Sequence, residues 1–279
     1  MNINALTRAD SDREIILLWL GDKSRTTQVS YRSIVSQFLL FVAQPLSDVA
    51  LEDLQLWHRR LQLTDQPHTV ANKIRAIKSL FSFCVKVGYL QVNVGSFIKC
   101  PKVKDKLAER VLSADECKKL IGATRNHRDR ALLSLMYACG LRVSEVCNLT
   151  WNDLQPHLDG GKATIFGKGA LTRVVLVPQS VWGQLMALPR SSNAVFVSRT
   201  GRPLERTMVF KIVKQCAIRA GVSEKASCHW LRHSHASHAI EGGCNLRLLQ
   251  QSLGHSKLET TERYLHISPE AGSSQFIDI

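Results

Sequence analysis

The sequence predicts a mainly α-helical protein made of an all-α domain and an α+β domain with a small antiparallel sheet. Apolar residues recur at helical spacing through the first hundred residues, where no run alternates as a strand does. A charged stretch without apolar periodicity, Lys99 to Arg110, follows. The second half is again helical, except for two short β-type runs. We therefore expect a helical domain over residues 1–103, a linker over 104–111 and the α+β domain over 112–279.

Four ranges before the linker have helical spacing: 11–20, 26–42, 46–61 and 68–87. Ser11 is the expected N-cap of the first helix. The last range has the clearest pattern, because its apolar positions step by four, three, four and three residues, at Val70, Ile74, Ile77, Phe81 and Cys84. Such a stripe predicts a helix with one buried face.

The opposite face of the 68–87 helix carries the basic residues Lys73, Arg75 and Lys78. A row of this kind is either a solvated surface or a surface that contacts phosphates, and the sequence does not choose between the two. We take the three residues as candidate DNA contacts.

Two helices of the second domain meet at an arginine. His127 to Cys139 is apolar nearly all round, which predicts a buried helix, and Gly140 ends it. The next helix begins directly afterwards, so Arg142 lies at the join, where an unpaired guanidinium is costly to desolvate. Glu145, three residues on, is the expected partner.

The β-type runs cover residues 163–166 and 171–177, and the turn between them reads G-K-G-A. Lys168 is therefore expected at the tip of a hairpin. Val195 to Val197, followed by Thr200-Gly201, is a further expected strand and turn, and helices are expected from Glu205 onward.

The charge balance indicates a polyanionic partner. Lys and Arg total 37 against 23 Asp and Glu, which gives a net charge of +14, and basic residues are in excess on both sides of residue 103. The eight cysteines include no C-x-x-C pair, and several lie within apolar helical patterns, which indicates reduced core residues. Since no apolar run approaches ~20 residues and no signal peptide is apparent, we expect a cytoplasmic, nucleoid-associated protein.

The stretch from Cys228 to Tyr264 gathers side chains suited to phosphoryl chemistry. His229 and Arg232 are three residues apart and share a helix face. His255 follows in the sequence L-G-H, and Tyr264 comes nine residues after it. A phenol nucleophile with guanidinium and imidazole partners can cut and rejoin a phosphodiester without a metal.

Each of these residues also has a structural explanation. In isolation, Tyr264 is an ordinary helix aromatic, Lys168 is a solvated turn lysine and His255 is a polar residue at a helix N-terminus. It is the shared order and spacing that favours the chemical interpretation.

The additional histidines His233, His235 and His238 raise the alternative of a zinc site, since His229 and His233 are four residues apart on one helix face. The glutamate of the metalloprotease motif is absent between them, and no pair of cysteines offers closing ligands. We therefore expect no metal and interpret His233 as a structural polar residue.

The motifs G-L-R-V-S-E, G-K-G, H-W-L-R-H and L-G-H, followed by Tyr264, occur in this order over about 120 residues. The set resembles the tyrosine recombinase (phage integrase) family and is most similar to its Xer-type subgroup. The resemblance covers essentially the whole chain, and residues 1–103 look like the family's core-binding (SAM-like) domain. It implies a site-specific DNA recombinase that needs neither ATP nor another cofactor.

In the chemistry that the resemblance implies, Tyr264 attacks the scissile phosphorus and forms a 3′-phosphotyrosyl link. A phenol has a pKa near 10, so it needs a proton acceptor and a cationic setting at neutral pH. Lys168 would protonate the departing 5′-oxygen.

The resemblance implies phosphate-binding roles for the remaining residues. Arg142 and Arg232 would bind the non-bridging oxygens through bidentate hydrogen bonds. His229 and His255 would bond to the phosphate and assist proton movement. Glu145 would lie behind them and orient Arg142 or His255.

Members of the family act on double-stranded DNA, so the resemblance also implies a homo- or hetero-tetramer formed on DNA, with the C-terminal tail docked on the neighbouring protomer. Phe276, Ile277 and Ile279 are the apolar residues that the tail offers. The sequence departs from the family at Val94, where proline is common, and at apolar Leu171, where a second basic residue is common.

Two other functions are compatible with the same residues. A type IB topoisomerase uses similar chemistry as a monomer that lets the cut strand swivel. A DNA-binding accessory protein without catalysis would keep the basic surface alone. The compact first domain, the short tail and the G-L-R-V-S-E motif favour recombination.

Overall fold

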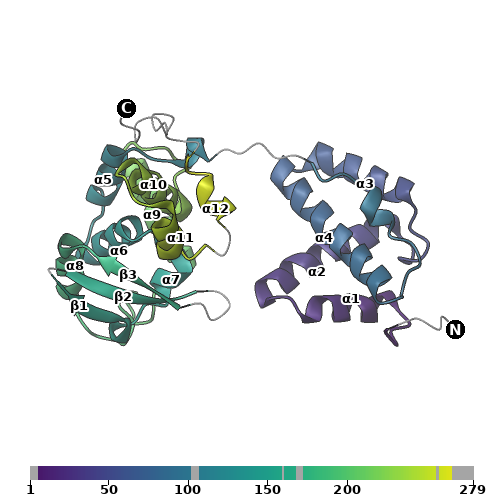
Figure 1. Cartoon of the computed structure of the whole chain (residues 1–279), viewed down its shortest axis with the longest axis horizontal. Coiled ribbons are helices and arrows are strands. Elements are labelled where there is room, and N and C mark those ends of the chain that lie inside the picture. Colours follow the sequence, from purple (N-terminus) through teal and green to yellow (C-terminus); the bar gives the residue numbers. More distant parts are fainter. Residues whose placement is uncertain (1–5, 102–106, 159, 168–171, 256–257, 266–279) are drawn as a thin grey trace, which may run out of the picture. The chain divides into compact units, whose positions relative to one another are not determined.

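A computed structural model describes residues 6–101, 107–158, 160–167, 172–255 and 258–265. The chain divides into two compact units, Met1–Lys104 and Asp105–Ile279, which we call the N-terminal and the C-terminal unit (Figure 1). No described helix combines the length and the apolar character needed to cross a bilayer. The predicted mainly α-helical fold with one small antiparallel sheet is confirmed.

The N-terminal unit is built around its last long helix. Its elements are α1 Asp12–Gly21, α2 Arg25–Val42, α3 Leu51–Thr64, α4 Pro67–Lys86 and the 3-10 turn η1 Val94–Phe97. Helix α4 contacts all the others, as Figure 1 shows. The predicted apolar stripe of α4 is confirmed, because all five of its residues are buried.

Two details of the N-terminal unit concern helix starts. Ser11 caps α1 as predicted, since its side chain accepts a hydrogen bond from the backbone N–H of Glu14. The third helix begins at residue 51, within the range 46–61 that was predicted for it. Leu46 and Val49 are buried in the preceding turn, so their apolar character serves the core without a helix.

The core of the N-terminal unit is aromatic at its centre. Phe38 of α2 is fully buried and meets Trp57 of α3 and Phe81 of α4 edge to face, at ring-centroid distances of 5.0 and 6.2 Å. Edge-to-face contacts add to the gain from burial. One side chain thus joins three helices.

The C-terminal unit places helices around a three-stranded sheet. Its elements are η2 Ala108–Arg110, α5 Ala114–Gly122, α6 His127–Ala138, α7 Val143–Cys147, η3 Trp151–Asp153, β1 Leu154–His157, β2 Gly160–Phe166, β3 Thr172–Val177, α8 Gln179–Met186, α9 Arg206–Arg219, α10 Cys228–Glu241, α11 Leu246–Leu253 and α12 Glu259–Glu262. Helix α5 begins with a full capping box between Ser113 and Glu116.

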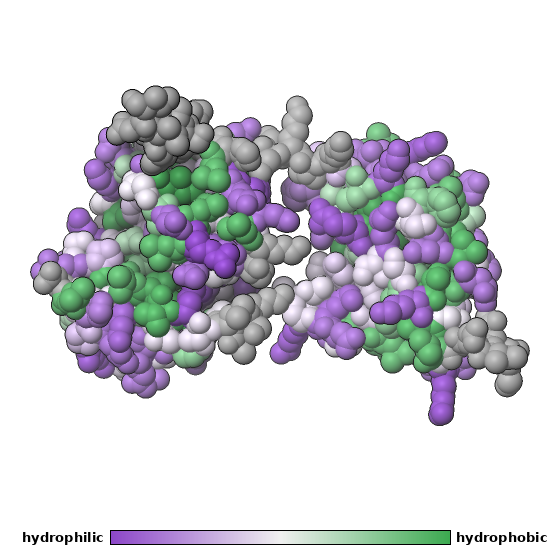
Figure 2. All heavy atoms as spheres, in the orientation of Figure 1, coloured by the Kyte–Doolittle hydropathy of each residue, from purple (hydrophilic) through white to green (hydrophobic). Residues whose placement is uncertain are grey.

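The sheet has the order β1-β2-β3 and is antiparallel throughout. Strands β2 and β3 were predicted, whereas β1 was not. Gly161 in β2 allows α8 to lie close, because a Cβ at this position would be 2.0 Å from the ring of Trp182. On the outer face, Phe166 and Val174 are more than half exposed, and Figure 2 shows apolar atoms gathered over the sheet.

The strand predicted at Val195 to Val197 does not form. Val195 donates to the carbonyl of Leu149, and Val197 makes an isolated bridge to Pro203. Proline has no backbone N–H, so a ladder cannot continue through it. The segment remains an irregular connection between α8 and α9.

Part of the predicted linker belongs to the C-terminal unit. Residues 108–110 form η2, and Leu107 is 5% exposed within an apolar cluster that includes Ala236 and Tyr264. The start of the C-terminal unit therefore packs against its last helices.

Replacing Phe38 by Ala should lower the free energy of unfolding of the N-terminal unit by about 3–5 kcal/mol, because the cavity left between three helices cannot collapse fully. Phe41→Ala is the matched control on the same helix, since Phe41 is 37% exposed, and it should cost about 1 kcal/mol or less. Urea unfolding of the full chain measures both. Equal losses would contradict the described core.

Candidate active site

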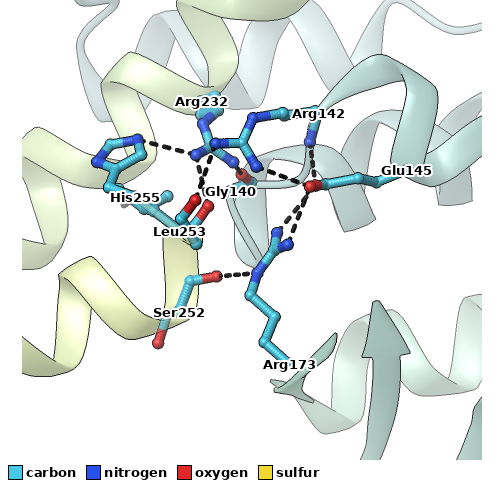
Figure 3. A network of polar contacts seen from close by, with 9 residues as sticks. Gly140, Arg142, Glu145, Arg173, Arg232, Ser252, Leu253 and His255 are labelled. Carbon is cyan, nitrogen blue, oxygen red and sulfur yellow. Dashed lines mark hydrogen bonds and ion pairs between the residues drawn. The ribbon is translucent and has the colours of Figure 1, made fainter. Parts of the chain in front are cut away.

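Three successive carbonyls at the C-terminal end of α11 each accept a hydrogen bond from a different arginine (Figure 3). The pairs are Ser252 with Arg173 Nε, Leu253 with Arg232 Nη2 and Gly254 with Arg142 Nη2, at 2.6, 2.7 and 3.2 Å. The last carbonyls of a helix have no intrahelical donor and carry the negative end of the helix dipole. The end of α11 therefore gathers three guanidiniums that come from three other elements.

Arg232 is the most buried of the three, at 5% exposed. Its Nη1 also donates to the carbonyl of Gly140, at 2.6 Å, and its Nη2 reaches Nε2 of His255 at 2.9 Å. Burial, and then the charge of Arg142, lower the pKa of Arg232 to about 9. The side chain is therefore still positively charged at neutral pH.

Glu145 forms ion pairs with two of these arginines. Its carboxylate receives two hydrogen bonds from Arg173, both at 2.9 Å, and one from Nη1 of Arg142 at 2.8 Å. The backbone N–H of Arg142 donates to the same carboxylate. Burial alone would raise the pKa of Glu145, but the bonds from Arg173 and Arg142 lower it overall. The contact between Arg142 and Glu145 predicted from the sequence is present.

The backbone geometry requires glycine at two positions of the sequence motifs. Gly140 has φ +60°, and a Cβ there would lie 2.5 Å from the ring of His235. Gly254 has φ +64°, and its Cβ would lie 3.1 Å from Nη1 of Arg173. Only glycine adopts this backbone region readily, so both positions let the backbone turn where carbonyls and arginines meet.

His255 has its tautomer fixed by its neighbours. Arg232 can only donate, so Nε2 of His255 is the acceptor in their contact, and Nδ1 carries the ring proton. That Nδ1 lies 2.9 Å from Oγ1 of Thr261, which is fully buried. Burial, followed by the charges of Arg232 and Arg142, lowers the pKa of His255 to about 4. The ring is neutral at physiological pH.

Tyr264 lies in the same unit, against helix α10. It is 3% exposed, and its hydroxyl is 2.7 Å from Nδ1 of His233. Its ring packs in the cluster with Leu107, Ala236 and Leu253. The residue predicted as nucleophile thus lies beside the helix that carries Arg232.

His229 lies one helical turn before His233 on α10, with ring centroids 6.5 Å apart. It is exposed and lines a cavity of about 620 Å³ together with Arg110, Lys225 and His233. Partial burial and then the charge of Arg232 lower the pKa of His229.

A larger cavity, of about 1060 Å³, lies on the side of the arginines. Arg142, Arg173 and His255 line it, and so does Gly167 at the end of β2. Lys168, the predicted general acid, lies outside the described residues, as does Leu171. The strand ends on either side, Phe166 of β2 and Thr172 of β3, are described and line the cavity.

The candidate DNA contacts on α4 differ in their surroundings. Lys73 forms an ion pair with Asp65 at 2.9 Å, and Nζ of Lys78 donates to the carbonyls of Ser96 and Ile98. Arg75 is exposed. Contact of these residues with DNA stays a prediction.

A model of the phage integrase family matches residues 110–271 of this sequence. The chain belongs to the phage integrase family. The predicted resemblance to the Xer-type tyrosine recombinases of this family is also confirmed.

Two curated relatives show the range of similarity within the phage integrase family. The tyrosine recombinase XerC of Xanthomonas campestris pv. campestris is 37% identical over 210 residues, which are 72% of this chain and 64% of XerC. The tyrosine recombinase XerD of Staphylococcus haemolyticus is 31% identical over 265 residues, which are 88% of this chain and 89% of XerD.

Solved structures with a similar fold include a lambda integrase dimer bound to a COC′ core site, with a TM-score of 0.77 and 18% identity. That match covers 96% of this chain and 79% of the integrase. XerH recombinase bound to a palindromic difH substrate has a TM-score of 0.70 and 19% identity, and the match covers 96% of both chains. These likenesses establish the fold.

Two residues of this phage integrase site, Arg173 and Thr261, were not singled out from the sequence, and a third, His233, was interpreted only as a structural polar residue. Arg173 ends the string G-K-G-A-L-T-R, His233 follows Arg232 directly, and Thr261 precedes Tyr264 by three residues. The spacing of Thr261 to Tyr264 is one helical turn, a signal that could have been used. Among the described residues, no three His, Cys, Asp or Glu side chains form a group that could hold a metal ion.

Glu145→Gln should lower the free energy of unfolding of the C-terminal unit by roughly 3 kcal/mol, the low end for breaking a buried ion pair, since the amide still accepts one hydrogen bond. Glu116→Gln is the control. Among the described residues its carboxylate bonds only to the backbone N–H of Ser113, near the surface, so the change should cost under about 1 kcal/mol. Chemical denaturation of both variants measures the two losses in free energy of unfolding. Losses of equal size would refute the bridging role.

The stability of the C-terminal unit should fall as the pH drops from about 6.5 to about 4. Burial is the main cause that lowers the pKa of His233, His235 and His255 to about 4 each. Below pH 6.5 the histidines of the unfolded chain therefore bind protons, whereas the same histidines in the folded chain stay neutral until about pH 4. This difference favours unfolding. Glu145, with its lowered pKa, adds to the loss only below about 4.5.

Melting temperatures measured by calorimetry between pH 7.5 and 4.5 test this slope. His255→Asn should make it shallower, whereas the exposed residue His157, changed to Gln, serves as the control and should leave it unaltered. A melting temperature that stays level across this interval would contradict the buried neutral histidines.

Proposed function

We propose that this protein is a site-specific DNA recombinase that cuts and rejoins double-stranded DNA through a covalent bond to Tyr264. The observation that carries the proposal is the convergence of Arg142, Arg173 and Arg232 on the end of α11, with Tyr264 of the same chain beside α10. Guanidiniums gathered at a cavity suit a phosphodiester, which they can bind through paired hydrogen bonds. Membership of the phage integrase family supports the same chemistry.

In the proposed reaction the phenol oxygen of Tyr264 attacks the scissile phosphorus while its proton passes to one of the imidazoles that assist proton movement, His229 or His255, and the bond from phosphorus to the 5′-oxygen breaks. The products are a 3′-phosphotyrosyl link and a 5′-hydroxyl, whose proton would come from Lys168. Attack by a 5′-hydroxyl of another strand reverses the steps and frees Tyr264. One phosphate ester replaces another at each stage, so the proposal includes neither ATP nor a metal.

The proposed roles of the phosphate ligands follow their exposure. The side chain of Arg142 is 34% exposed and lines the larger cavity, so it would meet a non-bridging oxygen directly. Arg232 is buried behind it and would reach the phosphate at the edge shared with His255. His229 would contact the phosphate from the neighbouring cavity. Glu145 and Arg173 would hold Arg142 in place without touching DNA.

We further propose that the protein acts as a tetramer on DNA. Proteins with the same fold have been solved as a dimer on a core site and as a tetramer on a Holliday junction, both of lambda integrase. The tail that would dock on a neighbouring protomer, with Phe276, Ile277 and Ile279, lies outside the described residues. On α4, exposed Arg75 is the readiest phosphate contact, whereas Lys73 and Lys78 would have to exchange their protein partners.

Tyr264→Phe should abolish the covalent adduct with DNA while DNA binding stays nearly unchanged, because only the nucleophilic oxygen is removed. The substrate is a pool of nicked duplexes with a randomised core, from which the wild-type protein captures its own site covalently. Adducts are resolved on denaturing gels and their DNA is sequenced. Tyr137→Phe is the control, since Tyr137 bonds to His238 on the other side of α10 and should leave capture intact.

An adduct formed by the Tyr264→Phe protein would show that another residue is the nucleophile. Two marked plasmids carrying the captured site then separate the related functions. Exchange of markers supports recombination, whereas relaxation without exchange indicates a topoisomerase. Tight binding without any adduct by the wild-type protein would indicate a non-catalytic DNA-binding protein.

A further inference from the structure

The hydroxyl of Tyr264 is held by a histidine that the proposed reaction does not use. Nδ1 of His233 lies 2.7 Å from the phenol oxygen, and the two ring centroids are 5.9 Å apart. Tyr264 is 3% exposed and packs against Ala236 and Leu253, so its ring has little freedom. The position of the oxygen is therefore set by packing on the ring and by His233 at its tip.

The register of α10 links this contact to the phosphate ligands. His233 is the residue after Arg232, and His229 lies one turn earlier on the same helix. Arg232 is fixed in turn by the carbonyls of Gly140 and Leu253. A bond from His233 to the phenol therefore fixes the nucleophilic oxygen relative to the guanidinium through one rigid helix.

We propose that His233 is a positioning residue for the nucleophile: its Nδ1 accepts a hydrogen bond from the hydroxyl of Tyr264 and holds the phenol oxygen ready for attack on the DNA phosphorus. The inference rests on the function proposed above, in which Tyr264 is the nucleophile. It replaces the structural role expected for His233 from the sequence.

The direction of the hydrogen bond follows from the ionisation of the two groups. Burial, and then the positive charges of His229, Arg110, Arg232 and Arg263, lower the pKa of His233 to about 4. The imidazole is therefore neutral and has one ring nitrogen free of hydrogen. A phenol O–H is a stronger acid than a neutral imidazole N–H, so the favoured arrangement has the phenol as donor. Such a bond leaves the lone pairs of the phenol oxygen directed away from His233.

The same chain contains a matched pair outside the site. Nδ1 of His238 lies 2.8 Å from the hydroxyl of Tyr137, again with ring centroids 5.9 Å apart. His238 is on α10 as well, five residues after His233. Neither residue of this pair lines the two cavities at the arginines and at His229. His238→Leu therefore removes an equivalent bond from the same helix without touching the proposed site.

One test needs no DNA. In the full chain labelled with ¹³Cζ-tyrosine, the Tyr264 signal is identified by its loss in Tyr264→Phe. His233→Leu should shift this signal, and His238→Leu should shift that of Tyr137 instead. Nitrogen NMR of the wild-type protein should find Nδ1 of His233 without a proton at neutral pH. A protonated Nδ1, or a Tyr264 signal unaffected by His233→Leu, would overturn the inference.

The second test measures the rate of adduct formation on the duplex captured by the wild-type protein. His233→Leu should slow cleavage by about 10²-fold, the scale expected for a misplaced reacting group, while DNA binding stays the same. His233→Asn should recover much of the rate, because its side-chain amide oxygen can occupy the position of Nδ1. His238→Leu should stay within about 2-fold of wild type. A melting temperature for each variant establishes that it is folded.

A duplex with sulfur in place of the bridging 5′-oxygen separates positioning of the nucleophile from protonation of the leaving group. A thiolate leaves without a proton, so this duplex should restore cleavage by Lys168→Ala but not by His233→Leu. Rescue of both would overturn the inference, as would a His233→Leu protein that cleaves at the wild-type rate. If the wild-type protein forms no adduct on any duplex, the proposed function itself fails and the inference with it.

Discussion

The end of helix α11 is the constraint on which the rest of the site depends. Its last carbonyls have no partners inside the helix, and three arginines from α10, β3 and the α6–α7 turn supply them. The glycines at positions 140 and 254 give the backbone the left-handed turns that bring these groups together. If Arg142 or Arg173 were removed, a carbonyl at this helix end and the carboxylate of Glu145 would both lose a partner. The three guanidiniums are therefore held together by one helix end.

Regular features of the fold could be predicted because they leave a periodic trace in the sequence. The α4 stripe and the N-cap at Ser11 leave such a trace, and both are present. Strand β1 was missed because it is only four residues long, contains Pro156 and has a single buried position. The segment at Val195 has β-type residues but forms only isolated bridges with described neighbouring loops. Amino-acid composition does not distinguish such bridges from a strand.

The candidate site was predictable to the extent that motif spacing marks it. Arg232 is bonded to His255, and both Arg142 and Arg232 bond to carbonyls at the end of α11. The contacts of Arg173 with Glu145 and of His233 with Tyr264 span 28 and 31 residues of chain, and no local pattern indicates such pairs. Lys168 lies outside the described residues, so its role stays a prediction.

The shared carboxylate has a consequence for the charge of the site. In the network around the end of α11, three guanidiniums face the single carboxylate of Glu145, while His233 and His255 are neutral. The network thus keeps a surplus of two positive charges. A resting phosphodiester carries one negative charge, and the five-coordinate species formed when a phenolate adds to it carries two. For the proposed reaction, the charge of the network therefore matches the five-coordinate species better than it matches intact DNA. Preferential stabilisation of that species lowers the activation barrier of cleavage.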